Sequence, residues 1–548
     1  MKRLGIALAV LVVLGAVAWK LLPEVLLRLP GWLGPKVGPP REVVWDAGPA
    51  TAAAPPAERP PNIVIILADD LGWNDLSVHG GGVGGGQVKT PRIDSIAREG
   101  VEFTNGYAAN ATCAPSRAAI MTGRYPTRSG FEFTPAGVAF MRGVALFDRD
   151  EDPPPIYHKE LEATYPARET QGLPGSEITI AELLRPRGYH TLHFGKWHLG
   201  ETPEFRPEAQ GFDESLGFYA GASKYLPEGD ANVENSKQDF DPIDRFLWPN
   251  LPFGVRKNGS DMFRPTEYMT DYLADEAVKA IAANRNRPFL MYLAFNAPHT
   301  PLQALRSDYD ALPGIANHTE RVYGAMVLGL DRAVGRVLDA LRAQGLEDDT
   351  LVFFTSDNGG ANYVGLPDLN KPFRGWKLTF FEGGVHMPFF VKWPAKLPKG
   401  VTNDAPVSGI DIFTTAAAAG GAALPADRVI DGVDLVPFAT GGASGRPHET
   451  LFWRSGHYRV VRAGDWKLQL SERPKQAWLF DLAHDPDEHV NLAAKQPERV
   501  AELTALLDAH AATQSQPLWP SLLEAAVRID KPLNTPTSPD DEYVYWAN

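Results

Sequence analysis

The chain contains several short, continuous runs of apolar residues, which are typical of strands covered on both faces of a sheet. The clearest is the β-branched run from Ile63 to Leu67. Similar runs lie at 288–295, 350–355 and 387–391, and a weaker one lies at 189–194. We expect these five segments to be strands of one sheet.

Helical patterns separate these runs. Thr90 and Pro91 have the residue types of an N-cap and a first helical residue. Further helices are expected at 176–188, 267–283 and 320–343, the last with apolar residues at helical spacing. Strands that alternate with helices predict an α/β fold, in which helices sandwich a mixed, mostly parallel sheet.

After about residue 400 the pattern changes to shorter strands. Several lie between positions 451 and 480, and a helical segment follows at Pro497 to Ala511. We interpret residues 440–515 as a smaller C-terminal domain with an antiparallel sheet and a packed helix. Residues 516–548 are expected to form an irregular tail.

The first residues have the pattern of an export signal. Two basic residues precede an unbroken apolar run from Leu4 to Val13, and small residues follow. We expect residues 1–33 to be a signal peptide or an uncleaved signal anchor that tethers the chain to a membrane. The protein would then be exported, either to the periplasm or out of the cell. Residues 34–61 are rich in Pro, Ala and Gly, which predicts a linker.

Composition restricts the possible partners and sites. Hydrophobic residues make up 44% and charged residues 22%, as in ordinary soluble proteins. The net charge of −14 argues against nucleic acid as a partner, because phosphate binding needs clustered Lys and Arg. With one cysteine, the chain has no internal disulfide and no cysteine-rich metal site. Cys113 is therefore either incidental or chemical.

Polar residues follow the predicted strands where each strand ends. Asp69 and Asp70 follow the first strand, Lys196 and His198 the strand at 189–194, His299 the strand at 288–295, and Asp357 and Asn358 the strand at 350–355. Taken alone, each group is as consistent with an ordinary turn, a helix cap or an exposed pair of side chains as with a functional site. Ligands of open α/β sheets bind beyond the carboxyl ends of the strands, so we expect these groups to share one edge.

The acidic members of this set have the chemistry of a hard-cation site. Asp69, Asp70, Asp357 and Asn358 offer oxygen ligands without thiolate or imidazole. This set suits calcium or magnesium better than zinc. Magnesium is less favoured because it tolerates crowded all-protein cages poorly.

The surroundings of Cys113 predict a helix N-terminus. Pro115 fits a first turn and Gly123 a helix stop. Cys113 would then lie where free backbone N–H groups favour an anion. Arg117, four residues on, returns to the same end of the helix and can bind a tetrahedral oxyanion.

This stretch resembles a known signature. Cys113-Ala114-Pro115-Ser116-Arg117 and Thr122-Gly123-Arg124 are similar to the C-x-P-S-R…T-G-R motif of type I, formylglycine-dependent sulfatases. The resemblance extends from about residue 62 to past residue 511. It also includes Asp69-Asp70, Gly195 to Gly200, Pro298 to Pro301, Ser356 to Gly359, Gly375 to Lys377 and Glu382 to Gly384. It implies an arylsulfatase-like enzyme with an alkaline-phosphatase-like fold and a catalytic domain over 62–439.

The resemblance also implies how the nucleophile is made and held. In that family a formylglycine-generating maturation enzyme oxidises the cysteine, here Cys113, and reads the Pro and Arg that follow it. The hydrated aldehyde is a geminal diol, and one of its oxygens attacks sulfur. That oxygen is held on one calcium ion by the oxygen ligands Asp69, Asp70, Asp357 and Asn358.

The remaining residues receive roles by the same resemblance. Arg117, Lys196 and Lys377 surround the charge that develops on the sulfate oxygens. His299, together with Lys377, protonates the leaving oxygen. His198 takes the proton of the second hydroxyl, and collapse to the aldehyde expels sulfate. The sequence around Lys377 diverges somewhat from the family pattern.

Three other functions are compatible with parts of this pattern. A phosphonate monoester or phosphodiester hydrolase would use the same signature on the same fold. A non-catalytic module that binds calcium and sulfated glycans would keep the fold without turnover. A cysteine hydrolase is disfavoured, because nothing places an orienting Asn or Asp beside Cys113. The loops at 128–174 and 219–262 should determine which small-molecule or carbohydrate sulfate ester is the substrate. Their sequences match no recognisable pattern, so the substrate stays open.

Overall fold

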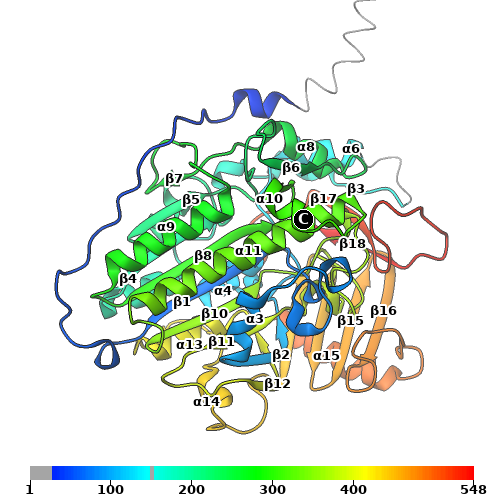
Figure 1. Cartoon of the computed structure of the whole chain (residues 1–548). Helices are drawn as coiled ribbons and strands as arrows, with labels where there is room; N and C mark the ends of the chain where they lie inside the picture. The colour runs from blue at the N-terminus through cyan, green and yellow to red at the C-terminus, as the bar shows by residue number, and fades with distance from the viewer. Residues whose placement is uncertain (1–27, 148–152) are drawn as a thin grey trace, which may run out of the picture.

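A nine-stranded sheet forms the centre of the computed structural model, which describes residues 28–147 and 153–548 (Figure 1). Across the sheet the strands are β12 (Val401–Ser408), β2 (Val101–Tyr107), β11 (Phe389–Lys392), β10 (Thr350–Ser356), β1 (Asn62–Asp69), β8 (Phe289–Pro298), β4 (His190–Lys196), β5 (Glu214–Phe218) and β7 (Arg256–Lys257). The five expected strands are therefore all present in one sheet.

The middle of the sheet is parallel. β1 pairs in parallel with β10 on one side and β8 on the other, and β8, β4 and β5 continue in the same direction. β11 and β7 run antiparallel to their neighbours. This confirms the mixed, mostly parallel sheet predicted from the sequence. The carboxyl ends of β1, β8, β4 and β10 consequently lie at one edge.

Helices cover both faces of the sheet because β1 is apolar on both. Val64, Ile66 and Ala68 pack into one hydrophobic cluster, and the intervening residues pack into a second. The first cluster includes residues of α3 (Pro91–Arg98), α9 (Met269–Asn284) and α11 (His318–Ala343). The second includes residues of α4 (Cys113–Thr122), α7 (Ile180–Leu184) and α13 (Asp411–Ala419). The continuous apolar run thus reflects burial on both sides.

Shorter elements connect this framework. They are α2 (Val83–Gly86), α5 (Pro126–Ser129), α6 (Val138–Phe147), α8 (Pro242–Asn250), α10 (Arg306–Asp310), α12 (Glu382–Val385), α14 (Val436–Ala439), and the strand pair β6 (Val233–Ser236) and β9 (Leu302–Leu305). The helix expected from residue 176 begins only after Thr179, which caps it together with Glu182.

A second, antiparallel sheet lies toward the C-terminus, drawn in orange in Figure 1. It contains β13 (Thr450–Ser455), β14 (Tyr458–Ala463), β15 (Trp466–Glu472) and β16 (Lys475–Asp481). One face packs against α15 (Pro497–Ala511) through Leu503 and Leu507. The other face shares a hydrophobic cluster with Phe380 and Phe381, which precede α12. The smaller sheet with its helix is as expected, and its core continues across the expected boundary at 439/440.

The expectation of an irregular tail at 516–548 is wrong. β17 (Leu523–Arg528) pairs with β18 (Tyr543–Ala547) and with β3 (Ile156–Tyr157) in a three-stranded sheet. Val527 and Trp546 are buried in the cluster that also contains Phe380. The partner β3 lies more than 350 residues earlier in the chain, so local pattern gave no sign of the pairing.

Residues 34–61 also differ from the expected linker. They run along the domain of the large sheet, and Val43 and Trp45 are buried in its core. The Trp45 indole N–H donates to Glu276 Oε2 at 2.9 Å. Two apolar residues therefore anchor a segment whose composition alone predicts free motion. Most of the expected signal segment, residues 1–27, lies outside the described residues. Among the described helices none is long and apolar enough to cross a membrane.

Candidate active site

The ends of β1 and β10 bring four oxygen-bearing side chains together. Ala68 is paired with Ser356, so Asp69 and Asp70 leave β1 beside Asp357 and Asn358. The Asp70 N–H donates to Asp357 Oδ1 at 3.3 Å, and Asn358 Nδ2 donates to Asp70 Oδ1 at 2.7 Å. All four side chains are buried. The predicted oxygen ligands are thus neighbours at the expected sheet edge.

Cys113 is the first residue of α4, as its surroundings predict. Thr112 is the extended N-cap, and Gly123 ends the helix with a φ of 68°. The Cys113 side chain is 4% exposed, and its sulfur lies 3.9 Å from Asp70 Oδ1. Burial raises the pKa of the Cys113 thiol to about 12, although Lys196 and Lys377 oppose the shift. The unmodified side chain is therefore a poor thiolate nucleophile, which disfavours a cysteine hydrolase.

Arg117 and Lys196 surround this cluster with positive charge. Arg117 Nε donates to Asp357 Oδ2 at 2.8 Å, and the other end of its guanidinium donates to the Lys196 carbonyl at 2.9 Å. Lys196 Nζ lies 2.8 Å from both carboxylate oxygens of Asp69. Burial alone would raise the pKa of Asp69, but Lys196, His299 and Arg117 outweigh it and lower that pKa.

Lys377 contacts both the nucleophile position and the acidic cluster. Its Nζ lies 2.8 Å from Asp70 Oδ1 and 3.2 Å from Cys113 Sγ. Burial would lower the pKa of Lys377, but Asp70 raises it well above its ordinary value. The Tyr363 hydroxyl donates to Asp70 Oδ2 at 2.9 Å. Sequence reasoning missed Tyr363, because nothing in its local pattern marks it.

The two histidines reach the site from different strands. His299, after β8, has Nδ1 2.5 Å from the Thr300 carbonyl and Nε2 3.6 Å from Asp70 Oδ2. Burial lowers the pKa of His299 to about 4. His198 follows β4, and a Cβ at Gly221 would lie 2.7 Å from its Nε2, so only glycine leaves room there. Burial and the nearby Lys196 lower the pKa of His198 well below its ordinary value. Both imidazoles are neutral in this arrangement.

Backbone strain concentrates at the same residues. Asp70 has a φ of 63° and His198 a φ of 61°, and Leu378, next to Lys377, has a φ of 71°. These are three of the five non-glycine residues with positive φ in the described parts of the chain. Such conformations cost about 1–3 kcal/mol and persist where surrounding structure imposes them. Their position at the cluster marks a functional site.

The cluster contains oxygen atoms that could bind a divalent cation. Asn358 Oδ1 is buried and, among residues 28–147 and 153–548, has no hydrogen-bond partner. Ligand atoms of Asp69, Asp70, Cys113 and His299 lie within 4.8 Å of one another. Asp357 lies outside that group, although it contacts the Asp70 N–H and Arg117. Carboxylate and amide oxygens fit a hard cation such as calcium.

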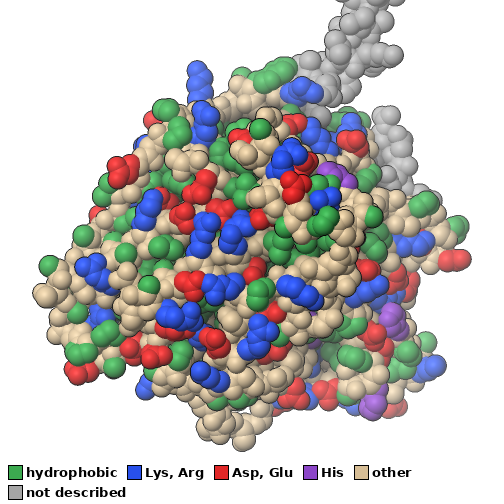
Figure 2. Space-filling view, viewed as in Figure 1, with side chains coloured by type: hydrophobic (Ala, Val, Ile, Leu, Met, Phe, Trp, Pro, Cys, Tyr) green, Lys and Arg blue, Asp and Glu red, His purple; other side chains and the backbone are tan. Residues whose placement is uncertain are grey.

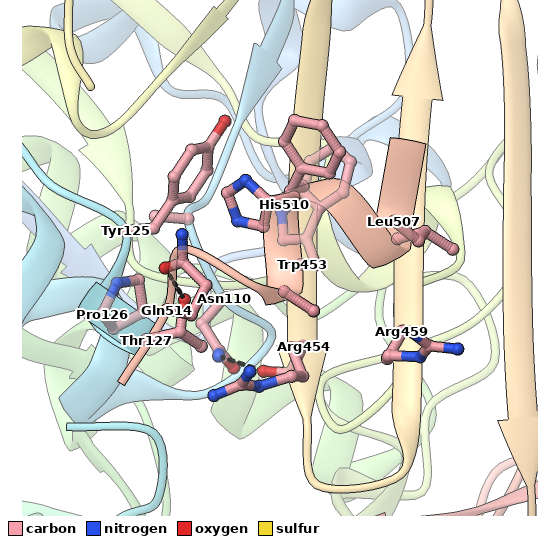
Figure 3. Close-up of a pocket in the computed structure, with 13 residues that line it drawn as sticks. Asn110, Tyr125, Pro126, Thr127, Trp453, Arg454, Arg459, Leu507, His510 and Gln514 are labelled. Atoms are coloured by element: carbon pink, nitrogen blue, oxygen red, sulfur yellow. Dashed lines mark hydrogen bonds between the residues drawn. The ribbon is translucent and has the colours of Figure 1, made fainter. Parts of the chain in front are cut away.

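A small hollow lies elsewhere, between α5, α15 and β13 (Figure 3). Tyr125, Phe452 and His510 line one part of it, and Arg454 and Arg459 another. Its volume is about 20 Å³, which is room for a water molecule. None of the predicted site residues lines it, so it is separate from the cluster around Cys113.

Several known proteins are similar to this chain in sequence. A family model described as Sulfatase matches residues 61–422. The steryl-sulfatase of Mus musculus is 33% identical to the chain, over 89% of this chain and 87% of its own. The N-acetylgalactosamine-6-sulfatase of Canis lupus familiaris is also 33% identical, over 78% and 74%.

Solved structures show the same fold. Ps i-CgsB in complex with k-i-k-neocarrahexaose has a TM-score of 0.70 and 30% identity, and the match covers 84% of this chain and 95% of that chain. The phosphonate monoester hydrolase SpPMH from Silicibacter pomeroyi has a TM-score of 0.57 at 20% identity, which is likeness of fold alone. The expected alkaline-phosphatase-like architecture is confirmed by these neighbours.

Proposed function

Because the chain belongs to the sulfatase family, we propose that it hydrolyses sulfate monoesters with a formylglycine made from Cys113 and one calcium ion bound at the ends of β1 and β10. That it is a sulfuric ester hydrolase follows from the family. The position of Cys113 is the observation that supports the formylglycine and calcium parts of the proposal. This lone cysteine is buried at a helix N-terminus, against Lys377 and beside Asp70.

Charge in the site supports a divalent cation and an anionic substrate. Asp69, Asp70 and Asp357 contribute three negative charges, and Arg117, Lys196 and Lys377 contribute three positive ones. A bound calcium ion would leave two positive charges in excess, which match the sulfate dianion formed by hydrolysis. Asp69, Asp70, Asp357 and Asn358 would hold the ion. It would acidify a bound hydroxyl and neutralise charge on a sulfate oxygen.

The cations of the chain have separate tasks. Arg117 is fixed by Asp357 and by the Lys196 carbonyl, so its position depends little on substrate. Lys196 pairs with Asp69, and Lys377 pairs with Asp70. Preorganised donors of this kind stabilise charge that develops in the transition state. The aldehyde at residue 113, when present, would supply the hydrated nucleophile that the thiol does not.

The two histidines would transfer protons in two different steps, departure of the alcohol and release of sulfate. His299, with Lys377, would protonate the leaving oxygen. The negative charge of an approaching sulfate would raise the pKa of this buried imidazole, which favours the protonated form when the substrate is bound. Burial, with the nearby Lys196, holds the pKa of His198 well below its ordinary value, so the ring is neutral. It can therefore accept the proton whose removal releases sulfate.

The relatives indicate the classes of sulfate ester to test. One is named for steryl and another for N-acetylgalactosamine sulfates, and the solved neighbour holds a neocarrahexaose. We therefore propose a sulfated carbohydrate or sterol as substrate. Export, with residues 1–33 as signal or anchor, and maturation by a formylglycine-generating enzyme belong to the same proposal.

A substrate panel tests the proposal. Rates on aryl sulfate, phosphonate monoester and phosphodiester would be compared side by side, with Cys113→Ala as the control. The aryl sulfate should be the preferred substrate, and Cys113→Ala should abolish turnover while the protein stays folded. A preference for the phosphonate would favour the alternative hydrolase instead. Binding of sulfated glycans without any turnover would favour the non-catalytic module.

A further inference from the structure

One end of the molecule carries a patch of exposed, large apolar side chains. Leu29, Trp32 and Leu33 belong to the helical residues 28–33, and Leu146 belongs to α6. Their exposed fractions are 38%, 64%, 77% and 56%. We call these four residues the apolar patch. Exposed clusters of large apolar side chains mark surfaces that contact a partner or a membrane.

α8 joins the two parts of the apolar patch. At its end, Asn250 Oδ1 accepts a hydrogen bond of 2.6 Å from the Gly31 N–H. Five residues earlier, the Arg245 guanidinium lies 4.9 Å from the centre of the Phe147 ring in α6. These two positions are about 8 Å apart along a helix. Figure 1 shows residues 28–33, in dark blue, with α8 and α6 at the same end of the molecule.

At the same end, α6 packs against α8, and exposed basic residues lie beside residues 29–33. The rings of Phe140 in α6 and Phe246 in α8 pack with their centres 5.0 Å apart. Arg28 and Lys36 lie on either side of Leu29, Trp32 and Leu33 in the sequence, Arg245 lies on α8, and all three are exposed. Four of the five residues that follow Phe147 in the sequence are acidic. The whole chain has a net charge of −14, and on the face in Figure 2 acidic and basic side chains are interspersed. Arg28 and Lys36 therefore place positive charge beside residues 29–33 in an otherwise acidic chain.

We propose that the apolar patch lies against a phospholipid bilayer. A tryptophan with leucines and flanking Arg and Lys is the side-chain mixture of a membrane interface. Arg28 and Lys36 would meet anionic headgroups. The apolar run of the predicted signal anchor, Leu4 to Val13, precedes the patch in the sequence. The chain is already packed against α8 at Gly31, so a body held by such an anchor would present this end to the bilayer.

The test uses the buried native cysteine, which leaves introduced cysteines free for labelling. Trp32→Cys and Leu146→Cys are made in the full chain, with Val429→Cys as the control, because Val429 is 56% exposed between α13 and α14. Each variant is labelled with a nitroxide and mixed with vesicles of phosphatidylcholine and phosphatidylglycerol. Collision with oxygen and with a water-soluble nickel complex is then measured by electron paramagnetic resonance.

We expect labels at 32 and 146 to gain oxygen accessibility and lose nickel accessibility when vesicles are added, while the label at 429 does not change. A label at 146 that stays accessible to nickel while the protein sediments with vesicles would overturn the proposal, because the chain would then be held by its N-terminal segment alone. Shielding of the label at 146 without vesicles, increasing with protein concentration, would also overturn it. A second copy of the chain would then cover the apolar patch.

Discussion

The Lys377 ammonium lies 3.2 Å from the Cys113 sulfur, and the same nitrogen is 2.8 Å from Asp70 Oδ1. One cation therefore joins the nucleophile position to a carboxylate of the predicted metal site. Lys377 is held there by a loop rather than by a strand. Leu378 with its positive φ and the Lys377 N–H bond to the Gly360 carbonyl fix that loop.

Removing this charge should slow catalysis more than it weakens folding. In Lys377→Met the side-chain length is kept and the cation is lost, so kcat/KM should fall by about 10²–10³-fold, as for other preorganised donors. Steady-state kinetics on an aryl sulfate measure the effect. Lys371→Met is the matched control, because Lys371 is exposed and pairs with the exposed Asp368. Equal rates for both variants would show that Lys377 has no role in the reaction.

Loss of a metal ligand should remove both metal and activity. In Asp357→Ala we expect calcium content to fall and the rate to drop on the order of a thousandfold, since a Lewis acid contributes several kcal/mol to the transition state. Elemental analysis and kinetics check this. Chelation of active protein without the substitution should have the same effect, and calcium should reverse it. Full metal content in Asp357→Ala would contradict the ligand assignment, and Asp368→Ala serves as an exposed acidic control.

The two histidines should fail in different ways. His299→Ala should impair hydrolysis most for alkyl or sugar sulfates and least for nitrophenyl sulfate, whose oxygen hardly needs a proton. His198→Ala should release one equivalent of alcohol in a burst and then stall, with residue 113 carrying the sulfo group. Stopped-flow kinetics and peptide mass measurement separate these outcomes. No burst in His198→Ala protein of verified formylglycine content would mean that His198 acts at another step.

A buried carboxyl outside the site should make stability depend on pH. Burial raises the pKa of Asp75 to about 7, although Tyr323 and the Gly72 N–H oppose the shift. The folded state therefore keeps a proton that the unfolded chain loses near pH 4, so this group stabilises the fold at low pH. Its contribution should decrease by up to about 1.4 kcal/mol per pH unit as pH rises toward 7.

Asp75→Asn should abolish this dependence. The amide oxygen can still accept bonds from the Tyr323 hydroxyl and the Gly72 N–H, which lie 2.6 Å and 2.7 Å from Asp75 Oδ2. The difference in urea midpoint between the variant and the natural chain should therefore grow in favour of the variant from pH 4 to pH 7. A difference that stays constant across this range would show that Asp75 titrates normally.

The parts of the site that follow strands were predictable because the signal is local. A continuous apolar run identifies β1, and the residues after it are then known to lie at the ligand edge. The same argument places Asp357 after β10 and His299 after β8. The helix at Cys113 was predictable because Pro115 and Gly123 mark its two ends.

Contacts between distant segments were not predictable. Tyr363 reaches Asp70 from a loop, and a buried lysine of the C-terminal sheet, Lys467, lies 2.7 Å from Glu382 beside the Lys377 loop. Such pairs depend on how separate elements pack and leave no periodic pattern in the sequence. The pairing of β17 with β3 and the burial of Trp45 escaped prediction for the same reason.

The central claim is that the nucleophile is made from Cys113. Mass spectrometry of the peptide that contains residue 113, from protein produced with and without a maturation enzyme, tests it most directly. The account predicts that turnover number rises in proportion to the fraction of residue 113 found as formylglycine, and that protein with only free thiol is inactive. Fully active protein in which residue 113 is entirely unmodified cysteine would contradict it.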